Sequence, residues 1–199
     1  MLILASNSAA RKSLLAGAGL RFETSPAQID ERGLEARLLG KPPEAIAREL
    51  AEAKALDVSR RRPGDSVIGG DQLLAFAGEL LHKPADLDEA RAQLDRLRGK
   101  LHHLYSGVAL ARDGQLLWSQ THSARLLMRD FPDAERDEVL ALEGEAALGS
   151  VGAYRLEGPS VRLFAAIEGD YFTILGLPLL PLLTALRLYA PETLAARPT

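Results

Sequence analysis

HHLYSGVALARDGQLLWSQTHSARLLM, His102–Met128, contains two strand-like runs, His102–Arg112 and Gln115–Met128, on either side of Asp113-Gly114. An Asp-Gly pair between two such runs favours a two-residue β-hairpin turn, because both residues tolerate a positive φ. A hairpin joins antiparallel neighbours, so a sheet built around it cannot be purely parallel. The stretch therefore predicts at least one antiparallel strand pair in the sheet.

The segments on either side of this hairpin predict further strands and helices. Ser66–Phe76 (SVIGGDQLLAF) predicts a buried strand that Gly78-Glu79 turns back on LLHK. The other expected elements are the strands Leu2–Ala5 and Phe22–Thr24, a hairpin of Val161–Ile167 with Tyr171–Leu175, the helices Arg11–Ala18, Pro43–Arg60, Asp86–Leu97, Asp133–Leu142 and Leu179–Tyr189, and a loop over Pro26–Gly40. Because strands and helices mix without strict βαβ alternation, the predicted fold class is α/β, a mixed sheet with helices packed on it.

The composition bounds the class of protein. Of the 199 residues, 47% are hydrophobic and 26% are charged, which suits one sizeable domain, expected over residues 1–190 with a loose tail over 191–199. The formal charge is −3 without a long basic run, which argues against binding of long nucleic acid or of an anionic membrane. The chain has no cysteine and shows no secretory signal, and its most apolar stretch, Phe172–Leu186, is too short and too broken by proline to span a bilayer. A cytoplasmic protein is the expectation.

Most common catalytic templates are missing from the sequence. No stretch matches a P-loop, a dinucleotide-binding GxGxxG, an HExxH zinc motif or a GxSxG nucleophile elbow. His102 and His103 would point to opposite faces of a strand, so a joint metal site there is not expected. Any phosphate chemistry must therefore come from a local arrangement of charged residues.

The opening residues offer one such arrangement. Ser6, Asn7 and Ser8 end an apolar run and precede a helix-like pattern that carries Arg11. Free backbone N–H groups and the dipole at a helix N-terminus favour an anion such as phosphate. Serine and asparagine are also preferred N-caps, so a plain helix cap is the alternative and the commoner role of such residues.

A second candidate lies inside the buried strand, where Gly69-Gly70 precede Asp71 and Gln72. A carboxylate in a strand interior is costly to bury unless it is paired or bound to a metal. Two glycines before it indicate that something approaches the backbone closely. The alternative is a β-bulge that turns Asp71 to solvent.

Two lysines complete the candidates. Lys83 stands in the motif HKP, where the proline fixes the exit of a strand, and Lys54 lies on an amphipathic helix, off the face shared by Glu49 and Glu52. An ordinary solvated lysine is the alternative for Lys83. For Lys54, Glu49 and Glu52 the default is a solvated helix face.

Taken together, the acidic Glu31 and Asp71 and the basic Arg11, Lys54 and Lys83 suit phosphoryl chemistry near one helix N-terminus. Carboxylates can hold a divalent cation, Mg²⁺ or Mn²⁺ alike, while arginine and lysine neutralise a polyphosphate. A water activated by the metal or by Asp71 could then attack a phosphorus atom.

In their order and spacing these motifs resemble those of the Maf (septum formation inhibitor) family of nucleoside triphosphate pyrophosphatases, from Leu2 to about Leu188. They appear here as LASNSAARK, the Glu31 of IDER, AEAKA, GGDQ, HKP, GAYRLEG and ILGLPL. The resemblance implies a mixed, bent sheet with flanking helices, in two lobes around a central cleft, as in the inosine triphosphate pyrophosphatases. It also implies hydrolysis of a nucleoside triphosphate to the monophosphate and pyrophosphate with a divalent cation.

The same resemblance implies the roles of individual residues. Asp71 corresponds to the family's proton acceptor, and Glu31 with Asp71 matches the metal-handling positions. The substrate-binding positions correspond to Ser6, Ser8, Arg11, Lys54 and Lys83.

Three positions bear on which nucleotide base the protein would prefer, namely Ala10, Gln72 and Glu157. A family branch acting on dTTP and UTP has G-A-D-T and G-A-Y-G-I-Q-G, whereas a branch acting on 7-methyl-GTP has S-D-Q and S-E-G, and Gln72 and Glu157 lean to the second. Glu157 could accept hydrogen bonds from a guanine edge or offset the positive charge of a methylated guanine. Ala9 and Ala10 depart from the family's proline and following bulky or basic residue, so Ala10 removes a side chain that could contact base or phosphate.

The preferred prediction is thus a pyrophosphatase for a small-molecule nucleotide, 7-methyl-GTP. The alternatives are a dTTP/UTP pyrophosphatase of the same family and a nucleotide-binding regulator of cell division with incidental turnover. Gln72 and Glu157 could also hydrogen-bond each other instead of reading a base. An apolar surface on the C-terminal half could support a homodimer.

Overall fold

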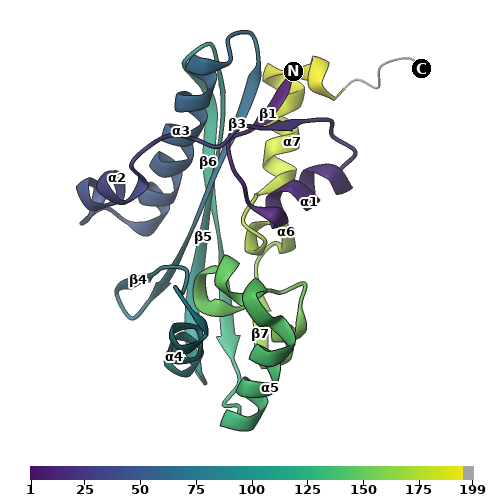
Figure 1. Ribbon diagram of the computed structural model, residues 1–199. Coiled ribbons are helices and arrows are strands. Elements are labelled where there is room, and N and C mark those ends of the chain that lie inside the picture. Colours follow the sequence, from purple (N-terminus) through teal and green to yellow (C-terminus); the bar gives the residue numbers. More distant parts are fainter. Residues whose placement is uncertain (195–199) are drawn as a thin grey trace. The chain divides into compact units, whose positions relative to one another are not determined.

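The fold is built on a mixed β-sheet (Figure 1). Within residues 1–194, which the computed structural model describes, seven strands hydrogen-bond in the order β2-β1-β3-β5-β6-β7, with β4 paired to β3 off this path. The strands are β1 (Leu2–Leu4), β2 (Glu23–Thr24), β3 (Ser66–Phe76), β4 (Glu79–Leu81), β5 (Leu101–Arg112), β6 (Gln115–Met128) and β7 (Phe164–Glu168). The predicted class, a mixed sheet with flanking helices, is confirmed.

The β5–β6 turn has the conformation that its residues predict. Asp113 has a φ of 51° and Gly114 a φ of 73°, both in the left-handed region. Two consecutive positive φ angles give a turn whose twist matches that of the flanking strands. The Asp113 carboxylate also accepts a hydrogen bond from the backbone N–H of Gly64 at 2.6 Å, which ties the turn to the loop before β3.

The five predicted helices are confirmed close to their predicted bounds. Among the helices of residues 1–194, none combines the length and the apolarity needed to cross a bilayer. The helices are α1 (Ala9–Gly17), α2 (Glu31–Leu38), α3 (Pro43–Arg61), α4 (Leu87–Leu97), α5 (Asp133–Glu143), α6 (Tyr171–Ile174) and α7 (Leu179–Tyr189), with shorter 3₁₀ helices η1 (Gly144–Gly149), η2 (Val151–Ala153), η3 (Pro159–Leu163) and η4 (Pro191–Thr193).

Two sequence predictions are wrong, and both fail at a helix cap. The predicted loop Pro26–Gly40 contains α2, whose N-cap Asp30 accepts a hydrogen bond from the N–H of Gly33. The predicted strand Tyr171–Leu175 is the single helical turn α6, capped by Asp170 through the N–H of Thr173. The hairpin predicted for it with Val161–Ile167 is therefore wrong: Val161–Leu163 belong to η3, and β7 pairs with β6 instead. In both places a side chain satisfies N–H groups that the helix leaves free, and this local gain outweighs a weak or strand-like hydrophobic pattern.

The chain divides into two compact units. The first unit comprises Met1–Asp71, Ser106–His122 and the segment from Gly176 on, and the second comprises Gln72–Tyr105 and Ser123–Leu175. Residues 195–199 of the expected tail lie outside the described residues. A single domain over residues 1–190, with two lobes around a central cleft, stays a prediction.

In the first unit the register of parallel strands brings two distant segments together. Strand β1 pairs in parallel with β3, with Leu4 opposite Ile68, and the N–H of Ala5 donates to the Ile68 carbonyl at 2.8 Å. The chain leaving β1 therefore begins the loop Ser6–Ser8 beside the part of β3 that leads to Asp71. Loops at the carboxyl ends of parallel strands are the usual place for a ligand site in α/β folds.

Helix α3 packs unusually close to the sheet of the first unit. A Cβ built on Gly69 of β3 would lie 2.0 Å from the carbonyl oxygen of Ala51, and one on Gly107 of β5 would lie 2.2 Å from that of Ala47. The alanines Ala51, Ala55, Ala109 and Ala111 fill the remaining contact and are fully buried. The predicted close approach at the glycines is confirmed, and it fixes the height of α3 above β3.

Replacing Gly69 by alanine is expected to lower the free energy of unfolding by about 2 kcal/mol, because overpacking forces backbone shifts in a dense core. The added methyl group would meet the α3 backbone, which cannot rotate away as a flexible side chain would. Urea unfolding checks this, with Gly17→Ala as the matched control, since a Cβ there meets nothing within 4 Å. Equal losses in the two variants would contradict the packing argument.

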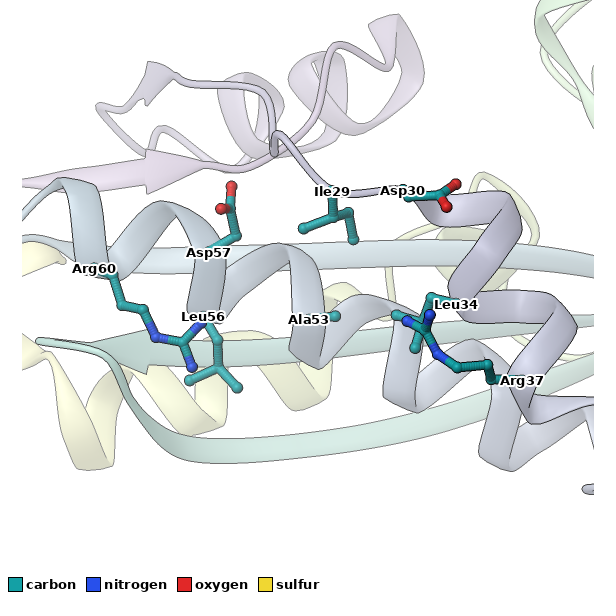
Figure 2. A pocket seen from close by; sticks show the side chains of 8 residues that line it. All are labelled: Ile29, Asp30, Leu34, Arg37, Ala53, Leu56, Asp57 and Arg60. Atoms are coloured by element: carbon teal, nitrogen blue, oxygen red, sulfur yellow. The ribbon is translucent and has the colours of Figure 1, made fainter.

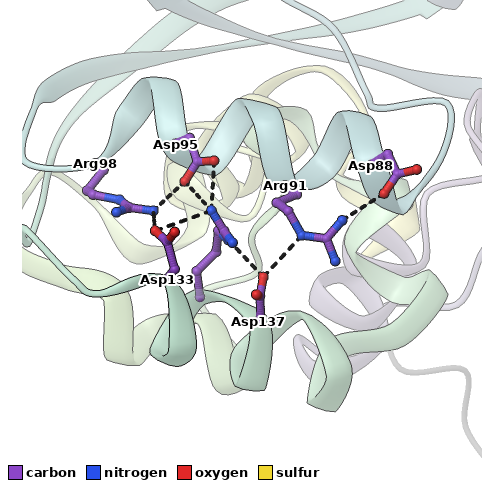
Figure 3. A network of polar contacts seen from close by, with 7 residues as sticks. Asp88, Arg91, Asp95, Arg98, Asp133 and Asp137 are labelled. Carbon is purple, nitrogen blue, oxygen red and sulfur yellow. Dashed lines mark hydrogen bonds and ion pairs between the residues drawn. The ribbon is translucent and has the colours of Figure 1, made fainter.

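The second unit has its own apolar core and an ion-pair ladder between α4 and α5 (Figure 3). Arg136 of α5, with a side chain only 8% exposed, donates to Asp95 at 2.7 Å and to Asp137 at 2.8 Å. Hydrogen bonds from Arg136 and Arg91 hold the pKa of Asp137 down to about 2. The ladder, whose other members are Asp88, Arg91, Arg98 and Asp133, fastens α5 to α4.

Candidate functional site

Lys54 joins two carboxylates in the first unit. Its Nζ lies 2.7 Å from Asp71 Oδ1 and 2.7 Å from Glu31 Oε2. The side chains of Lys54 and Asp71 are 9% and 11% exposed, whereas that of Glu31 is 53% exposed. A buried carboxylate and a buried ammonium are tolerated because each compensates the charge of the other. The alternative in which a bulge turns Asp71 to solvent is therefore wrong.

Three elements supply this cluster. Asp71 follows the two glycines of β3, and the close packing of α3 at Gly69 brings Lys54 within reach of it. Glu31 is the first residue of α2, directly after the capping Asp30. The default of a solvated helix face is wrong for Lys54.

Glu49 and Glu52, which also lie on α3, are half-buried and each is engaged by another side chain, so neither lies on a fully solvated face. Glu49 forms an ion pair with Lys41 at 2.7 Å, and Glu52 accepts a hydrogen bond from Ser119 at 2.6 Å. These contacts occupy the other face of α3, away from the carboxylates that Lys54 joins.

Arg11 adds a fixed positive charge beside the cluster. Its Nε donates to the carbonyl of Gly176 at 2.7 Å and its Nη1 to Ser6 Oγ at 3.1 Å, and the side chain passes over Gly70, where a Cβ would meet it at 3.1 Å. Burial lowers the pKa of Arg11, while the charges of Asp71 and Glu31 oppose the shift. An arginine stays charged under such a shift, so the site keeps a held cation.

The loop Ser6–Ser8 acts as a helix cap. Ser8 Oγ accepts from the N–H of Arg11 at 3.4 Å, and Ser6 Oγ accepts from the N–H of Ser8 at 3.2 Å. The capping alternative is thus confirmed. Ser6 has a second role, since it also orients the Arg11 guanidinium.

The carboxylates offer donors for a hard cation. Glu31 and Asp71 converge on one point, the position of Lys54 Nζ, which shows that the backbone brings both groups to bear on a single positive charge. Within residues 1–194 no three acidic or histidine side chains gather tightly enough to hold a metal on their own. Two carboxylates completed by phosphate oxygens and water are the donor set typical of Mg²⁺. The residues present fit that ion when a polyphosphate is bound.

Three other predicted site residues belong to the second unit. Gln72 is half-buried, and its amide donates to the carbonyls of Thr173 at 3.2 Å and Ile174 at 2.9 Å. These bonds engage the Gln72 amide without Glu157, which is exposed in the turn after η2. Lys83 is exposed in the segment after β4. The predicted specificity residue Ala10 belongs to the first unit, half-buried in the first turn of α1.

Reasoning from the sequence missed one residue that orients the segment around Lys83. Gln93 of α4, which is buried, donates to the carbonyl of His82 at 2.9 Å and so fixes the residue that precedes Lys83. Its position between Ala90 and Leu94 on the buried face of α4 is the signal, because a polar side chain on such a face needs a partner.

A cavity of about 360 Å³ lies between α3 and the segment that leads into α2 (Figure 2). Its walls include Asp30 and Ala53, the sequence neighbours of Glu31 and Lys54, but neither member of the ion pair itself. Asp57 on its rim is already engaged by Arg61 and by the N–H of Gln28. The charged side chains of Glu31, Lys54 and Asp71 therefore do not line this cavity. The lining is Ile29, Asp30, Leu34, Arg37, Ala53, Leu56, Asp57 and Arg60.

Comparison with known proteins agrees with the motifs. The family model described as "Maf-like protein" matches residues 1–189. A 7-methyl-GTP pyrophosphatase of Brucella abortus is 52% identical over 188 residues, covering 94% of this chain and 94% of the relative, and one of Mesorhizobium japonicum is equally similar. A nucleoside triphosphate pyrophosphatase of Rhodopseudomonas palustris is 50% identical over 94% of this chain and 92% of its own length. With nearly the whole chain matched, the protein belongs to the Maf family.

Proposed function

We propose that this protein is a nucleoside triphosphate pyrophosphatase that hydrolyses 7-methyl-GTP to 7-methyl-GMP and pyrophosphate with a divalent cation. The observation that carries the proposal is the buried Asp71 carboxylate, paired with Lys54 beside the held guanidinium of Arg11. The names of relatives about half identical over nearly the full length support the same activity and the same base.

Asp71 is the proposed proton acceptor. Lys54 engages Oδ1 at 2.7 Å and leaves the second carboxylate oxygen, Oδ2, to face another partner. Oδ2 can therefore take a proton from a water molecule as the water oxygen bonds to phosphorus. The bond between the α-phosphorus and its bridging oxygen breaks, and pyrophosphate leaves with that oxygen.

Basic and hydroxyl groups bind the triphosphate in this proposal. Arg11 is held by Gly176 and Ser6 before substrate arrives, so little conformational entropy is lost when phosphate binds. Lys54 contributes a second cation and Ser8 a hydroxyl at the helix N-terminus, where the dipole favours an anion. Lys83, exposed in the second unit, is the remaining proposed phosphate ligand.

Glu31 and Asp71 would hold the divalent cation together with phosphate oxygens. When bound, such an ion neutralises phosphate charge and polarises the phosphorus centre. Lys54 already bridges the two carboxylates, so it keeps them together when no cation is bound.

The proposed base recognition rests on the second unit. Gln72 is oriented by two backbone carbonyls, and the exposed Glu157 carboxylate can accept hydrogen bonds from a guanine edge and offset the charge of a methylated base. The small Ala10 leaves room beside the opening loop. Together these residues favour 7-methyl-GTP over dTTP and UTP, the alternative within the family.

We also propose a homodimer, for which α7 offers an apolar surface. Leu180 is 57% exposed and Leu188 70%, eight residues apart on the same helix face. Light scattering at several protein concentrations tests this assembly independently of the activity.

The first experiment measures pyrophosphate release from 7-methyl-GTP, GTP, dTTP, UTP, ITP and XTP with Mg²⁺ or Mn²⁺. We expect kcat/KM for 7-methyl-GTP to exceed that for GTP by about tenfold, which corresponds to about 1.4 kcal/mol. We expect EDTA to abolish turnover and added Mg²⁺ to restore it. Preference for pyrimidines would keep the enzyme class and overturn the base assignment. Nucleotide binding without turnover would favour the alternative of a regulator of cell division.

A further inference from the structure

Glu143, the last residue of α5, carries a fully buried carboxylate, with a side chain that is 0% exposed. Arg155 Nε donates to Oε2 at 2.7 Å, while the N–H and Oγ of Ser160 donate to Oε1 at 3.0 Å and 2.7 Å. Burial pushes the pKa of Glu143 up, but the hydrogen bonds from Ser160 and Arg155 outweigh burial and hold its pKa below the usual value. The group is therefore a buried anion with every contact directed to one segment.

That segment is the tight turn from Arg155 to Ser160, called the clamp turn here. Its ends are the two residues that Glu143 binds, and inside it the N–H of Gly158 donates to the Arg155 carbonyl at 3.2 Å. A Cβ built on Gly158 would lie 2.4 Å from Glu143 Oε1, so only glycine lets the carboxylate approach this closely. Glu157 stands at the exposed tip of the turn.

The helix that carries Glu143 is itself anchored. Arg136, Val139 and Leu140 share its buried face at helical spacing, and the ion pair of Arg136 with Asp95 fastens α5 to α4. The clamp turn is thus tied to the packed body of the second unit by the Glu143 carboxylate, in addition to Leu156, which packs against the apolar core.

We propose that Glu143 is a positioning residue for base selectivity: by bracketing the clamp turn it holds the Glu157 carboxylate in the place where it meets the base. This inference rests on the proposed function, which assigns base recognition to Glu157. A loose turn would have to be ordered each time a base bound, at a cost in affinity. The clamp removes that cost before the nucleotide arrives.

A purely structural role for Glu143 predicts something different. If the clamp only stabilised the second unit, its loss would lower the unfolding temperature and affect every nucleotide equally. A positioning role predicts instead a loss confined to the base that Glu157 recognises. Selectivity, the ratio of kcat/KM for 7-methyl-GTP to that for GTP, separates the two.

The test is Glu143→Gln, which keeps an acceptor for Ser160 but sets an amide NH₂ against Arg155. We expect KM for 7-methyl-GTP to rise about tenfold with kcat nearly kept, because ground-state binding is lost rather than a transition-state contact. Selectivity should fall toward that of Glu157→Ala. The matched control is Glu138→Gln, on the same helix, whose carboxylate forms an exposed ion pair with Arg162 at 2.8 Å and should leave selectivity unchanged.

A double substitution decides whether the two residues act together. If Glu143 works through Glu157, Glu143→Gln adds no further loss of selectivity to Glu157→Ala, since coupled residues are not additive. Additive losses would overturn the proposal. Should Glu143→Gln fail to fold, Ser160→Ala removes one hydrogen bond to the carboxylate while the backbone N–H bond remains, and a smaller fall in selectivity is expected.

Hydrogen exchange of the backbone amides of residues 155–158 and 160 in the free protein adds a readout that needs no turnover. Faster exchange in Glu143→Gln than in Glu138→Gln is expected, and equal exchange would overturn the clamp. Wild-type protein that turns over no nucleotide would overturn the proposed function and the selectivity role with it. Wild-type preference for 7-methyl-GTP with unchanged selectivity in Glu143→Gln would overturn this inference alone.

Discussion

Asp71→Asn is expected to lower kcat for 7-methyl-GTP by about 10³-fold, within the range that general-base groups contribute. Asparagine has the same shape and can still accept the hydrogen bond from Lys54 Nζ, so the fold and the phosphate site should persist. What it lacks is the basicity to take a proton from water and the negative charge that Asp71 would offer a divalent cation. Pyrophosphate release gives kcat, and calorimetric titration with the nucleotide in the absence of turnover gives the affinity.

The matched control is Asp57→Asn on α3, whose carboxylate serves Arg61 and the N–H of Gln28. This variant should keep kcat, because Asp57 lies outside the charged cluster. A kcat for Asp71→Asn within about tenfold of wild type would contradict the role of Asp71 as proton acceptor. If the protein were a regulator with incidental turnover, Asp71→Asn would keep its effect on cell division. If the protein acts as an enzyme, Asp71→Asn would lose that effect.

How far the sequence predicts the fold depends on how local each signal is. The Asp113-Gly114 turn and helices such as α4 and α7 follow from turn chemistry and hydrophobic period, and all are found near their predicted bounds. Helix α2 was missed because its period is weak and Gly33 stands in its first turn, although Asp30 was the available capping signal.

The site was less accessible to reasoning from residue types. The costs of burial suggested correctly that Asp71 is paired, but its partner depends on how closely α3 approaches β3, which Gly69 and Gly107 set from distant parts of the chain. The helical spacing predicts that Lys54 lies off the face of Glu49, but it does not predict that the Lys54 side chain points toward Asp71. Residue types and the family's motifs both grouped Lys54 with Asp71 at one site, but neither predicted their direct contact.

Lys54→Met is expected to cost both stability and activity. Methionine keeps the length of the side chain but leaves Asp71 buried without its counter-charge, and breaking a buried ion pair from one side costs about 3 kcal/mol. Turnover should fall by about 100-fold or more, because a held cation near the reacting phosphate is lost. Urea unfolding measures the first effect and pyrophosphate release the second.

Lys41→Met provides the control, since Lys41 also forms a 2.7 Å ion pair with a glutamate but is 48% exposed. Exposed pairs contribute roughly 0–1 kcal/mol, so this variant should keep both stability and activity. Equal stability of Lys54→Met and wild type would show that Asp71 does not depend on Lys54 for its charge.

The double variant Lys54→Met/Asp71→Asn separates the two costs. Without the carboxylate no uncompensated buried charge remains, so part of the lost stability should return, by about 1–2 kcal/mol relative to Lys54→Met alone. Turnover should not return, because the proton acceptor is gone as well. Recovered stability with no activity would mean that the protein needs the charged Lys54–Asp71 pair for catalysis and not for folding, because a neutral pair at the same positions stabilises the fold nearly as well. Failure to recover stability would instead show that Lys54 stabilises the protein through its second contact, with Glu31.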